Sequence, residues 1–357
     1  MAAITETRLS ITRAARHRLF WPAVILVILL VTNVFFSGSF FKVEFRDGHL
    51  YGSVIDILRA SAPLGLVALG MTLVIATGGI DLSVGAVVAI AGALACLRIS
   101  GLDDQNSVTG VLLAVGLALL LSLALGVWNG FLVATVGIQP IIATLILMVA
   151  GRGLAQLITD GQIITINSSP YKMIGAGYWL GLPLCVIIAV GVAVVAGLIV
   201  RRSALGLLLE SVGGNAEASR LAGIKSRWLI LIVYVFAGLC AGIAGLMISS
   251  NVSSADGNNA GLLIELDAIL AVVIGGTSLS GGRFSIAGTI LGAVIIKTLD
   301  ITIYTVGIPP EVTLLFKAVV VVVLCLAQAP KFREKFQRRR PSAPAPQAPQ
   351  QKVEVTA

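Results

Sequence analysis

Long apolar stretches separated by short polar segments occupy most of the chain. Each stretch is close to the ~20 apolar residues that a helix needs to cross a hydrocarbon core roughly 30 Å thick. They lie at 20–36, 54–77, 82–99, 108–136, 138–158, 180–200, 229–250, 264–280, 284–306 and 310–329. Continuously apolar stretches are typical of helices, whereas membrane barrel strands alternate between apolar and polar positions. We therefore expect an all-α, polytopic membrane protein with about ten transmembrane helices.

The basic residues are distributed unevenly between the segments that separate these stretches. If the amino terminus lies in the cytosol, seventeen Lys and Arg residues fall in cytosolic segments, and only Lys42, Arg46 and Lys172 fall outside. Membrane proteins keep an excess of basic residues on the cytosolic side. The distribution therefore predicts that both termini are cytosolic, which requires an even number of spans, and ten satisfies this requirement.

Charge and composition also divide the chain into three parts. Residues 1–19 form a basic cytosolic segment, and the stretch after it has no small-residue cleavage site, which favours a retained helix over a signal peptide. Residues 20–329 form the transmembrane domain, with its longest cytosolic loop at 201–228. Residues 330–357 are first basic and then rich in proline, which predicts a disordered cytosolic tail.

The composition excludes a water-soluble globule. The chain is 57% hydrophobic and 12% charged, with a mean hydropathy of +1.00, whereas soluble domains are about a quarter charged. The net charge of +8 arises mainly at predicted helix ends, so it does not indicate a nucleic-acid partner. The four cysteines lie in apolar stretches without CxxC spacing, which favours a packing role.

Sequence motifs for bond chemistry are missing. The chain has no GxxxxGK[ST] motif, so it is not an ATP-hydrolysing subunit, and no HExxH or Cys/His cluster predicts a metal site. A membrane-embedded enzyme would need convergent catalytic side chains, of which the sequence offers too few. We expect no cofactor in this chain and no enzymatic activity.

Polar side chains at membrane depth are costly and therefore indicate function. The candidates for a substrate pathway are Asp81, Ser83, Asn129, Gln139, Thr144, Arg152, Gln156, Thr277, Ser278 and Ser280. Gly78-Gly79 is expected to open a helix, and Asp81-Leu82-Ser83 to cap the next one beside a cavity suited to a polyhydroxylated substrate. The alternative is that Asp81 caps an ordinary cytosolic turn and touches no substrate.

Two further polar sets have alternative interpretations. Arg152 and Gln156 are spaced i, i+4, so they share a helix face that could line a pore with Gln139 and Thr144. The alternative is that Arg152 snorkels or pairs structurally. Glu265 and Asp267 lie where a span should begin at the outer surface; they cap that helix or contact an external partner, and capping is favoured.

One motif occurs twice. Gly78-Gly-Ile-Asp-Leu-Ser-Val-Gly85 and Gly275-Gly-Thr-Ser-Leu-Ser-Gly-Gly282 share GG-x-x-L-S-x-G, and the predicted topology gives both the same orientation. Transporters are often built from repeated halves, although chance similarity is an alternative in a glycine-rich chain. Pairs such as Gly126/Gly130, Gly238/Gly242 and Gly288/Gly292 have the spacing of close helix contacts.

The cytosolic loop 201–228 is amphipathic and predicts a short helix. Asn215 is suited to the N-cap, Ala216–Ala222 to the helix, and Gly223 to the terminating C′ position. A rigid two-turn element of this kind would project from the membrane and dock on another protein. The alternative is a connector that lies on the membrane surface without a partner.

These motifs resemble those of the permease subunits of ribose-type ABC importers, the second carbohydrate uptake class. The resemblance spans about residues 50–330 and rests on Gly78–Gly85, Gln139-Pro-Ile-Ile-Ala-Thr-Leu145, Gly213–Ile224, Glu265-Leu-Asp-Ala-Ile269 and Gly275–Gly282. Within the family, residues 47–58 and 147–158 are most similar to galactofuranose importer permeases.

The resemblance implies a type II ABC importer-like complex in a bacterial inner membrane. Its parts would be two permease subunits, a cytosolic ATPase that carries ATP and Mg, and a periplasmic sugar-binding protein. The galactofuranose likeness favours two different permeases. Segment 214–224 would be the coupling helix, and its contact residues would be Gly214, Asn215, Glu217, Ser219, Arg220 and Gly223.

The coupling segment departs from the family pattern at one point. This chain has Ala216-Glu-Ala-Ser219 where the family often has Pro-Glu-Ala-Ala, a change that leaves the helix and cap intact. The main alternative function is an ion-coupled secondary transporter of a small polar solute. It would need a carboxylate deep in a span, and only Asp81 comes near this requirement.

Overall fold

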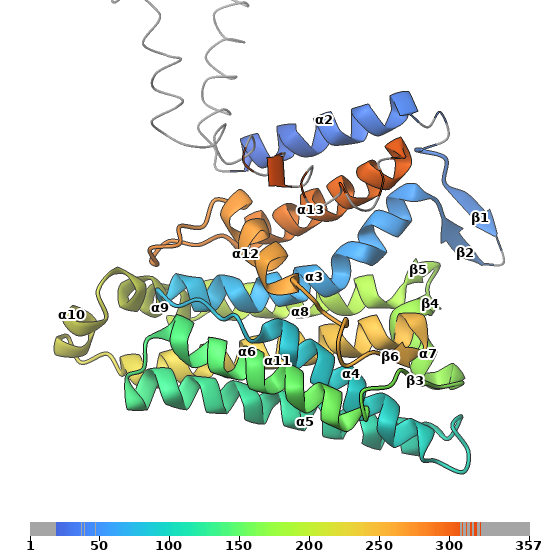
Figure 1. Cartoon of the computed structure of the whole chain (residues 1–357). Coiled ribbons are helices and arrows are strands. Elements are labelled where there is room, and N and C mark those ends of the chain that lie inside the picture. The colour runs from blue at the N-terminus through green and yellow to red at the C-terminus, as the bar shows by residue number, and fades with distance from the viewer. Residues whose placement is uncertain are drawn as a thin grey trace, which may run out of the picture.

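The computed structural model describes residues 19–36, 38, 40–46 and 48–307, together with the isolated positions 309, 312, 315, 318, 319 and 322. The basic segment before residue 19, the tail and most of the predicted stretch 310–329 lie outside this part of the chain. The described residues form a helical bundle with short connections at its two ends (Figure 1).

Each of the first nine apolar stretches contains a helix, and three further short helices of the described chain, α7, α9 and α10, lie between these stretches. The helices are α2 (Phe20–Phe36), α3 (Ser53–Ala76), α4 (Val84–Ser100), α5 (Val108–Phe131) with its π-helical extension η1 (Leu132–Val136), α6 (Pro140–Ile158), α7 (Ser169–Ala176), α8 (Leu184–Arg202), α9 (Leu205–Gly214), α10 (Ala216–Leu221), α11 (Ser226–Val252), α12 (Ile264–Ile274) and α13 (Ile286–Val306).

Six helices in the described part of the chain are long and apolar enough to cross a membrane: α3, α5 with η1, α6, α8, α11 and α13. The apolar helices α2 and α4 are shorter, with 17 residues each. This confirms a polytopic, mainly helical membrane protein. The count of ten spans and the orientation of the termini remain predictions.

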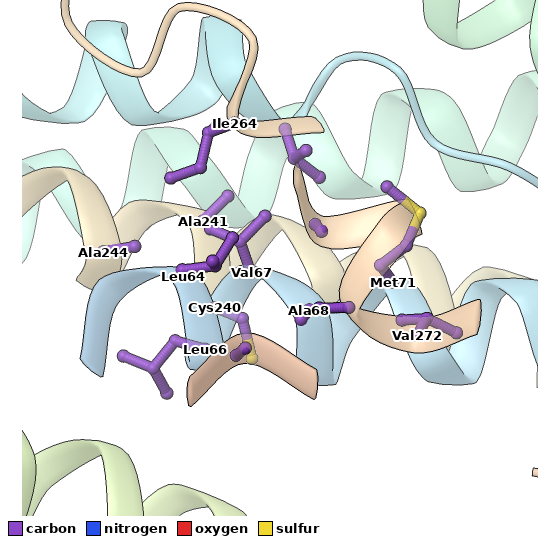
Figure 2. Close-up of a cluster of buried hydrophobic side chains, with 14 of the residues drawn as sticks. Leu64, Leu66, Val67, Ala68, Met71, Cys240, Ala241, Ala244, Ile264 and Val272 are labelled. Carbon is purple, nitrogen blue, oxygen red and sulfur yellow. The ribbon is translucent and has the colours of Figure 1, made fainter. Parts of the chain in front are cut away.

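The bundle is built around α3 and α11, which are the most buried of the six long apolar helices. Figure 2 shows side chains of α3, such as Leu64 and Met71, packed with Cys240 of α11 and Val272 of α12. Small residues allow this approach: a Cβ at Gly70 of α3 would lie 2.8 Å from the Ala237 Cα of α11. In a membrane, lipid supplies no hydrophobic drive for helices to associate, so close backbone packing holds them together instead.

The glycine pairs predicted to mediate helix contacts do so. A Cβ at Gly126 would lie 2.7 Å from the Tyr234 carbonyl oxygen, and one at Gly238 would lie 2.6 Å from the Ser122 carbonyl oxygen. Both contacts join α5 to α11. A Cβ at Gly292 of α13 would overlap the main chain of Ala271 in α12.

One predicted helix is shorter than expected. The stretch 264–280 is mainly apolar, but α12 ends at Ile274 and residues 275–285 form a loop. Gly276 has φ +85°, a left-handed conformation that glycine adopts without the steric cost of a Cβ. Ser285 then begins α13, since its Oγ accepts a hydrogen bond from the Gly288 N–H at 3.1 Å.

The connections divide into two sets, one at each end of the bundle (Figure 1). The α10 end carries α9, α10 and the loops 77–83 and 275–285. The strand end carries α7 and three antiparallel strand pairs. These pairs are β1 (Glu44–Arg46) with β2 (His49–Tyr51), β3 (Ile164–Thr165) with β6 (Ser254–Ala255), and β4 (Tyr178–Trp179) with β5 (Leu182–Pro183).

Candidate functional site

The short helix α10 has the structure that its sequence predicts. The Asn215 Oδ1 accepts a hydrogen bond from the Ala218 N–H at 2.9 Å and so caps the amino terminus. At the other end Gly223 has φ +85°, and the Ile224 N–H donates to the Ser219 carbonyl oxygen at 3.0 Å. This is a Schellman motif. Cap, helix and terminator are confirmed, with Ala222 at the C-cap position.

The outward surface of α10 is free for contact with another protein. Glu217 and Arg220 form an ion pair at 2.6 Å, and their side chains are 65% and 56% exposed. The Arg220 guanidinium holds the pKa of the Glu217 carboxyl below its ordinary value by donating a hydrogen bond to it. Leu221 beside them is 75% exposed. Ser219, by contrast, is buried.

Helix α9 connects α10 to both glycine-rich loops. A Cβ at Gly213 would overlap the Ala76 carbonyl oxygen at the end of α3 and the main-chain nitrogen of Gly282. The Gly282 N–H donates to that same Ala76 carbonyl at 2.9 Å. A Cβ at Gly281 would lie 3.1 Å from the Gly78 Cα. The two copies of the repeated motif therefore meet each other and α9 at the α10 end.

Three of the predicted pathway residues form one buried network. The Asp81 Oδ1 accepts hydrogen bonds from the Ser83 N–H at 2.9 Å and the Ser83 hydroxyl at 2.6 Å. The Asn129 amide of α5 donates to the Ser83 Oγ at 2.7 Å. Asp81 is 2% exposed, Ser83 1% and Asn129 1%. The network fixes loop 77–83 against α5.

Thr144 of α6 holds the same loop from a second side. Its buried Oγ accepts a hydrogen bond from the Leu82 N–H at 3.1 Å and donates to the Pro140 carbonyl at 2.9 Å. Ser83 occupies the N-cap position of α4, as the sequence predicts, but its hydroxyl bonds to Asp81 and not to the helix. The carboxylate is also buried, so Asp81 does not belong to an exposed turn.

Polar atoms without partners surround this network. Among the described residues, the Asn129 Oδ1 and the Tyr234 hydroxyl are buried and lack a hydrogen-bond partner. The Tyr234 hydroxyl lies against Gly79, where a Cβ would come within 2.7 Å of it. A buried polar group without a partner costs about 1–3 kcal/mol. Tyr234 is absent from the predicted set, and its position in an apolar stretch offered no signal for it.

Arg152 and Gln156 share a face of α6, as their spacing predicts, and Arg152 pairs with the main chain, which agrees with the structural alternative to a pore-lining role. The Arg152 Nη1 donates to the Ala260 carbonyl at 2.7 Å, and the Gln156 amide donates to the Asn258 Oδ1 at 3.0 Å. Both therefore hold the loop between α11 and α12. Gln139 is exposed at the opposite end of α6, roughly 20 Å from Arg152 along the helix axis.

Glu265 lies inside the bundle and not at its surface. It is 3% exposed in the first turn of α12, and a Cβ at Gly85 of α4 would overlap its Oε2. The expectation of a surface position is wrong because residues 256–263 fold back against α4, where Gly85 leaves room for the carboxylate. Asp267, two residues further along the same first turn, lies 3.8 Å from the Lys297 ammonium of α13.

The remaining pathway candidates belong to the junction at the α10 end. Thr277 is buried, and its Oγ accepts a hydrogen bond from the Ser285 N–H at 3.2 Å. Ser278 and Ser280 are exposed in the same loop, where the Ser280 N–H donates to the Ser278 Oγ at 3.2 Å. These residues do not touch the Asp81 network and lie instead in the loop that contacts Gly213.

Three features together define the membrane subunit of a transporter. They are the polytopic helical bundle, the capped helix α10 at one end of it, and the buried polar loops that α9 joins to α10. The chain belongs to the family described as branched-chain amino acid transport system / permease component, which matches residues 53–325. No solved structure matches the chain.

Three curated relatives cover most of this chain. The galactofuranose transporter permease protein YtfT of Escherichia coli is 48% identical over 90% of this chain and 94% of its own. The fructose import permease protein FruF of Bifidobacterium longum is 44% identical over 88% of each chain. The ribose import permease protein RbsC of Haemophilus influenzae is 36% identical over 85% of this chain and 90% of its own.

These relatives confirm two expectations from the sequence. The resemblance to permeases of ribose-type ABC importers is a family relationship that extends over nearly the whole chain. The relatives are permease subunits and not enzymes, so this chain is a transport subunit without bond chemistry of its own.

Proposed function

We propose that the chain is the permease subunit of an ATP-driven importer that moves a monosaccharide, galactofuranose or a related sugar, into the cytoplasm across a bacterial inner membrane. The observation that carries this proposal is the capped, exposed helix α10, which α9 joins to both glycine-rich loops. The choice of sugar is supported by the galactofuranose permease that is 48% identical over nearly its whole length.

Helix α10 is the element to which a cytosolic ATPase would bind. The cap and the Schellman motif make it rigid, and the exposed Glu217, Arg220 and Leu221 offer charged and apolar contacts. ATP and Mg would bind to that partner and not to this chain. Because Gly213 touches Ala76, directly before loop 77–83, and Gly282 of loop 275–285, a displacement of α10 would act on both loops together.

The Asp81 network would set the state of the pathway between α4, α5 and α6. Its present bonds leave the Asn129 Oδ1 and the Tyr234 hydroxyl without partners among the described residues. A displaced loop 77–83 could offer these atoms new partners, which would bring the two arrangements close in free energy. ATP-driven switching of the permease between outward-open and inward-open states requires an element with two such arrangements.

The orientation follows from the distribution of basic residues. The α10 end would face the cytosol, and the strand end would face the periplasm and receive a sugar-binding protein. A second permease, either a paralogue or a second copy, would cover part of the exposed apolar surface. Helix α8 is the least buried of the six long apolar helices and is suited to such a contact or to lipid.

An ion-coupled secondary transporter remains the alternative, and the buried carboxylates of Asp81 and Glu265 are the observation in its favour. Proteoliposomes that contain the chain, its partner permease and the binding protein distinguish the two functions. The importer requires ATP and the ATPase for uptake of labelled sugar. Uptake driven by a proton or sodium gradient without the ATPase would establish the alternative.

Two substitutions test the role of α10 in the same system. Glu217→Lys reverses the exposed charge, and Gly223→Val places a β-branched residue at φ +85°. We expect both variants to insert in the membrane and to lose ATP-dependent uptake. Lys172→Gln, on the exposed face of α7 at the strand end, is the control. Normal uptake in both α10 variants would refute the coupling role.

A further inference from the structure

A pocket with three polar side chains lies between the central helices α3 and α11 at the strand end. Its volume is about 380 Å³, and α7 and α8 complete its wall with Gly175 and Cys185. Most of the wall is apolar, and the polar side chains in it are Asp56, Arg59 and Asn251. This volume and this combination of an apolar wall with a few polar groups are typical of sites for small molecules.

The polar side chains offer both donors and acceptors. The Arg59 Nη2 donates to the Asn251 Oδ1 at 2.5 Å, which joins the start of α3 to the end of α11. An arginine carries five N–H donors, and the asparagine amide adds two. Asp56, one turn before Arg59, supplies a carboxylate that only accepts when ionised. A ligand with several hydroxyl groups, each both donor and acceptor, matches this set.

An aromatic group adjoins these side chains. Tyr178 is close enough to Arg59 and Asp56 for both charges to act on its phenol group. The His49 ring stacks on Tyr178 with centroids 4.5 Å apart, and the Tyr51 ring lies 5.6 Å from it. Aromatic rings with a polar edge combine a large apolar face with hydrogen-bonding capacity. They suit a ring that has C–H groups on its faces and hydroxyls at its rim.

The pocket and α10 lie at opposite ends of the same two helices. Helix α11 begins at Ser226, shortly after α10, and its penultimate residue, Asn251, lines the pocket. It spans about 40 Å at 1.5 Å per residue. Helix α3 runs the other way, from Asp56 and Arg59 to Ala76, which contacts Gly213. Both helices thus connect the pocket to the coupling element.

We propose that this pocket is the site where the sugar first contacts the permease after it leaves the binding protein. Arg59, Asn251 and Asp56 bind its hydroxyl groups. The inference rests on the proposed function and deepens it by naming the entry site. Occupation of the pocket by the second permease is the competing explanation, and the experiment below separates the two.

The first measurement is transport by the complete complex in proteoliposomes. Asn251→Ala removes the amide, and Arg59→Lys keeps the charge but loses the planar fork of donors. With saturating binding protein and labelled galactose, ribose or fructose as probes, we expect uptake to fall about tenfold or more in both variants. Lys172→Gln, exposed on α7 at the same end, serves as the control and keeps wild-type uptake.

The second measurement is direct contact. Asp56→Cys is introduced in a chain whose four cysteines, Cys96, Cys185, Cys240 and Cys325, are replaced by alanine, so that the exposed thiol at the pocket is the one that reacts. A membrane-impermeant maleimide applied from the periplasmic side reports its accessibility. At least one of the three probe sugars, galactose, ribose or fructose, should slow the labelling severalfold at millimolar concentration, and mannitol should not. The second permease is quantified in the same preparations by co-purification.

Each outcome decides between the explanations. Reduced uptake together with protection by the sugar supports the pocket. Wild-type uptake in both variants, or labelling that no sugar slows, overturns it, and ATP-dependent uptake by the unsubstituted complex then leaves the proposed function intact. Loss of the second permease from the Asn251→Ala and Arg59→Lys complexes, without protection by sugar, also overturns it and identifies a subunit contact. If the unsubstituted complex imports no sugar, the proposed function fails, while the labelling still decides the pocket.

Discussion

Gly213 of α9 lies directly against the Ala76 carbonyl oxygen at the end of α3, with no space for a Cβ between them. That carbonyl also accepts the hydrogen bond from the Gly282 N–H at 2.9 Å. Three segments far apart in the sequence therefore share one point of contact. A movement of the helix pair α9–α10 would therefore act on the end of α3 and on loop 275–285 at the same point.

Substitution of Gly213 should uncouple α10 from the bundle. In Gly213→Ala the added methyl group overlaps backbone atoms, so α9 must shift away from α3. We expect ATP hydrolysis by the complex to continue while sugar uptake falls at least tenfold. Gly116→Ala in α5 is the matched control, because a Cβ there meets no atom within 4 Å. Equal loss of uptake in both variants would contradict a specific role for the contact.

The cap of α10 should matter more for coupling than for overall stability. Asn215→Ala removes the acceptor for the Ala218 N–H, which costs about 1 kcal/mol of local helix stability. We expect unchanged thermal unfolding and a reduced ratio of sugar imported to ATP hydrolysed. Ser107→Ala removes an equivalent cap from α5 at the strand end and should leave that ratio unchanged. An unaffected ratio in Asn215→Ala would show that a frayed α10 still couples.

Ser83 should be the most sensitive hydroxyl of the buried network. Ser83→Ala leaves the Asn129 amide and the Asp81 Oδ1 without their shared partner, at a cost of about 1–3 kcal/mol. A lower unfolding temperature of the detergent-solubilised protein measures this cost. Ser122→Ala is the control, since that buried hydroxyl donates only within its own helix, to Ala118. A smaller effect at Ser83 than at Ser122 would refute the network.

Tyr234 should tolerate the loss of its hydroxyl. Its oxygen is buried against Gly79 without a hydrogen-bond partner among the described residues, so Tyr234→Phe removes a desolvated polar atom. We expect equal or higher thermal stability, together with slower ATP-dependent uptake if the hydroxyl finds a partner when loop 77–83 moves. A marked drop in stability would show that the hydroxyl is satisfied in the resting protein.

Arg152 should stabilise the loop between α11 and α12. Arg152→Gln loses the hydrogen bonds to the Ala260 and Gly257 carbonyls and removes the positive charge near Glu265. We expect a loss of about 1.5–3 kcal/mol, measured by thermal unfolding. The double variant with Glu265→Gln should recover part of the lost stability, because it removes the buried carboxylate that the Arg152 charge would otherwise stabilise. Gln156→Ala, at the exposed end of the same face, should change stability little.

Local sequence was sufficient for features that depend on neighbouring residues. The cap at Asn215 and the terminator at Gly223 needed only their own side chains and conformations, and both are confirmed. Glycine spacing similarly predicted the close contacts of Gly126 and Gly238. Partners from distant segments were beyond the local sequence. It left two interpretations open for Arg152, which holds a loop, and it did not predict that Glu265 is buried against α4.

The sequence by itself determined that this protein is a bundle of apolar helices, because lipid allows no other way to satisfy the backbone of such stretches. It also determined the short capped helix and, through family motifs, the class of transporter. Only the tertiary structure decided that the two glycine-rich loops meet at Gly213, and that Asp56, Arg59 and Asn251 share one pocket. Helix pairing depends on how faces of distant segments fit together, and a linear pattern of apolar residues does not specify that fit.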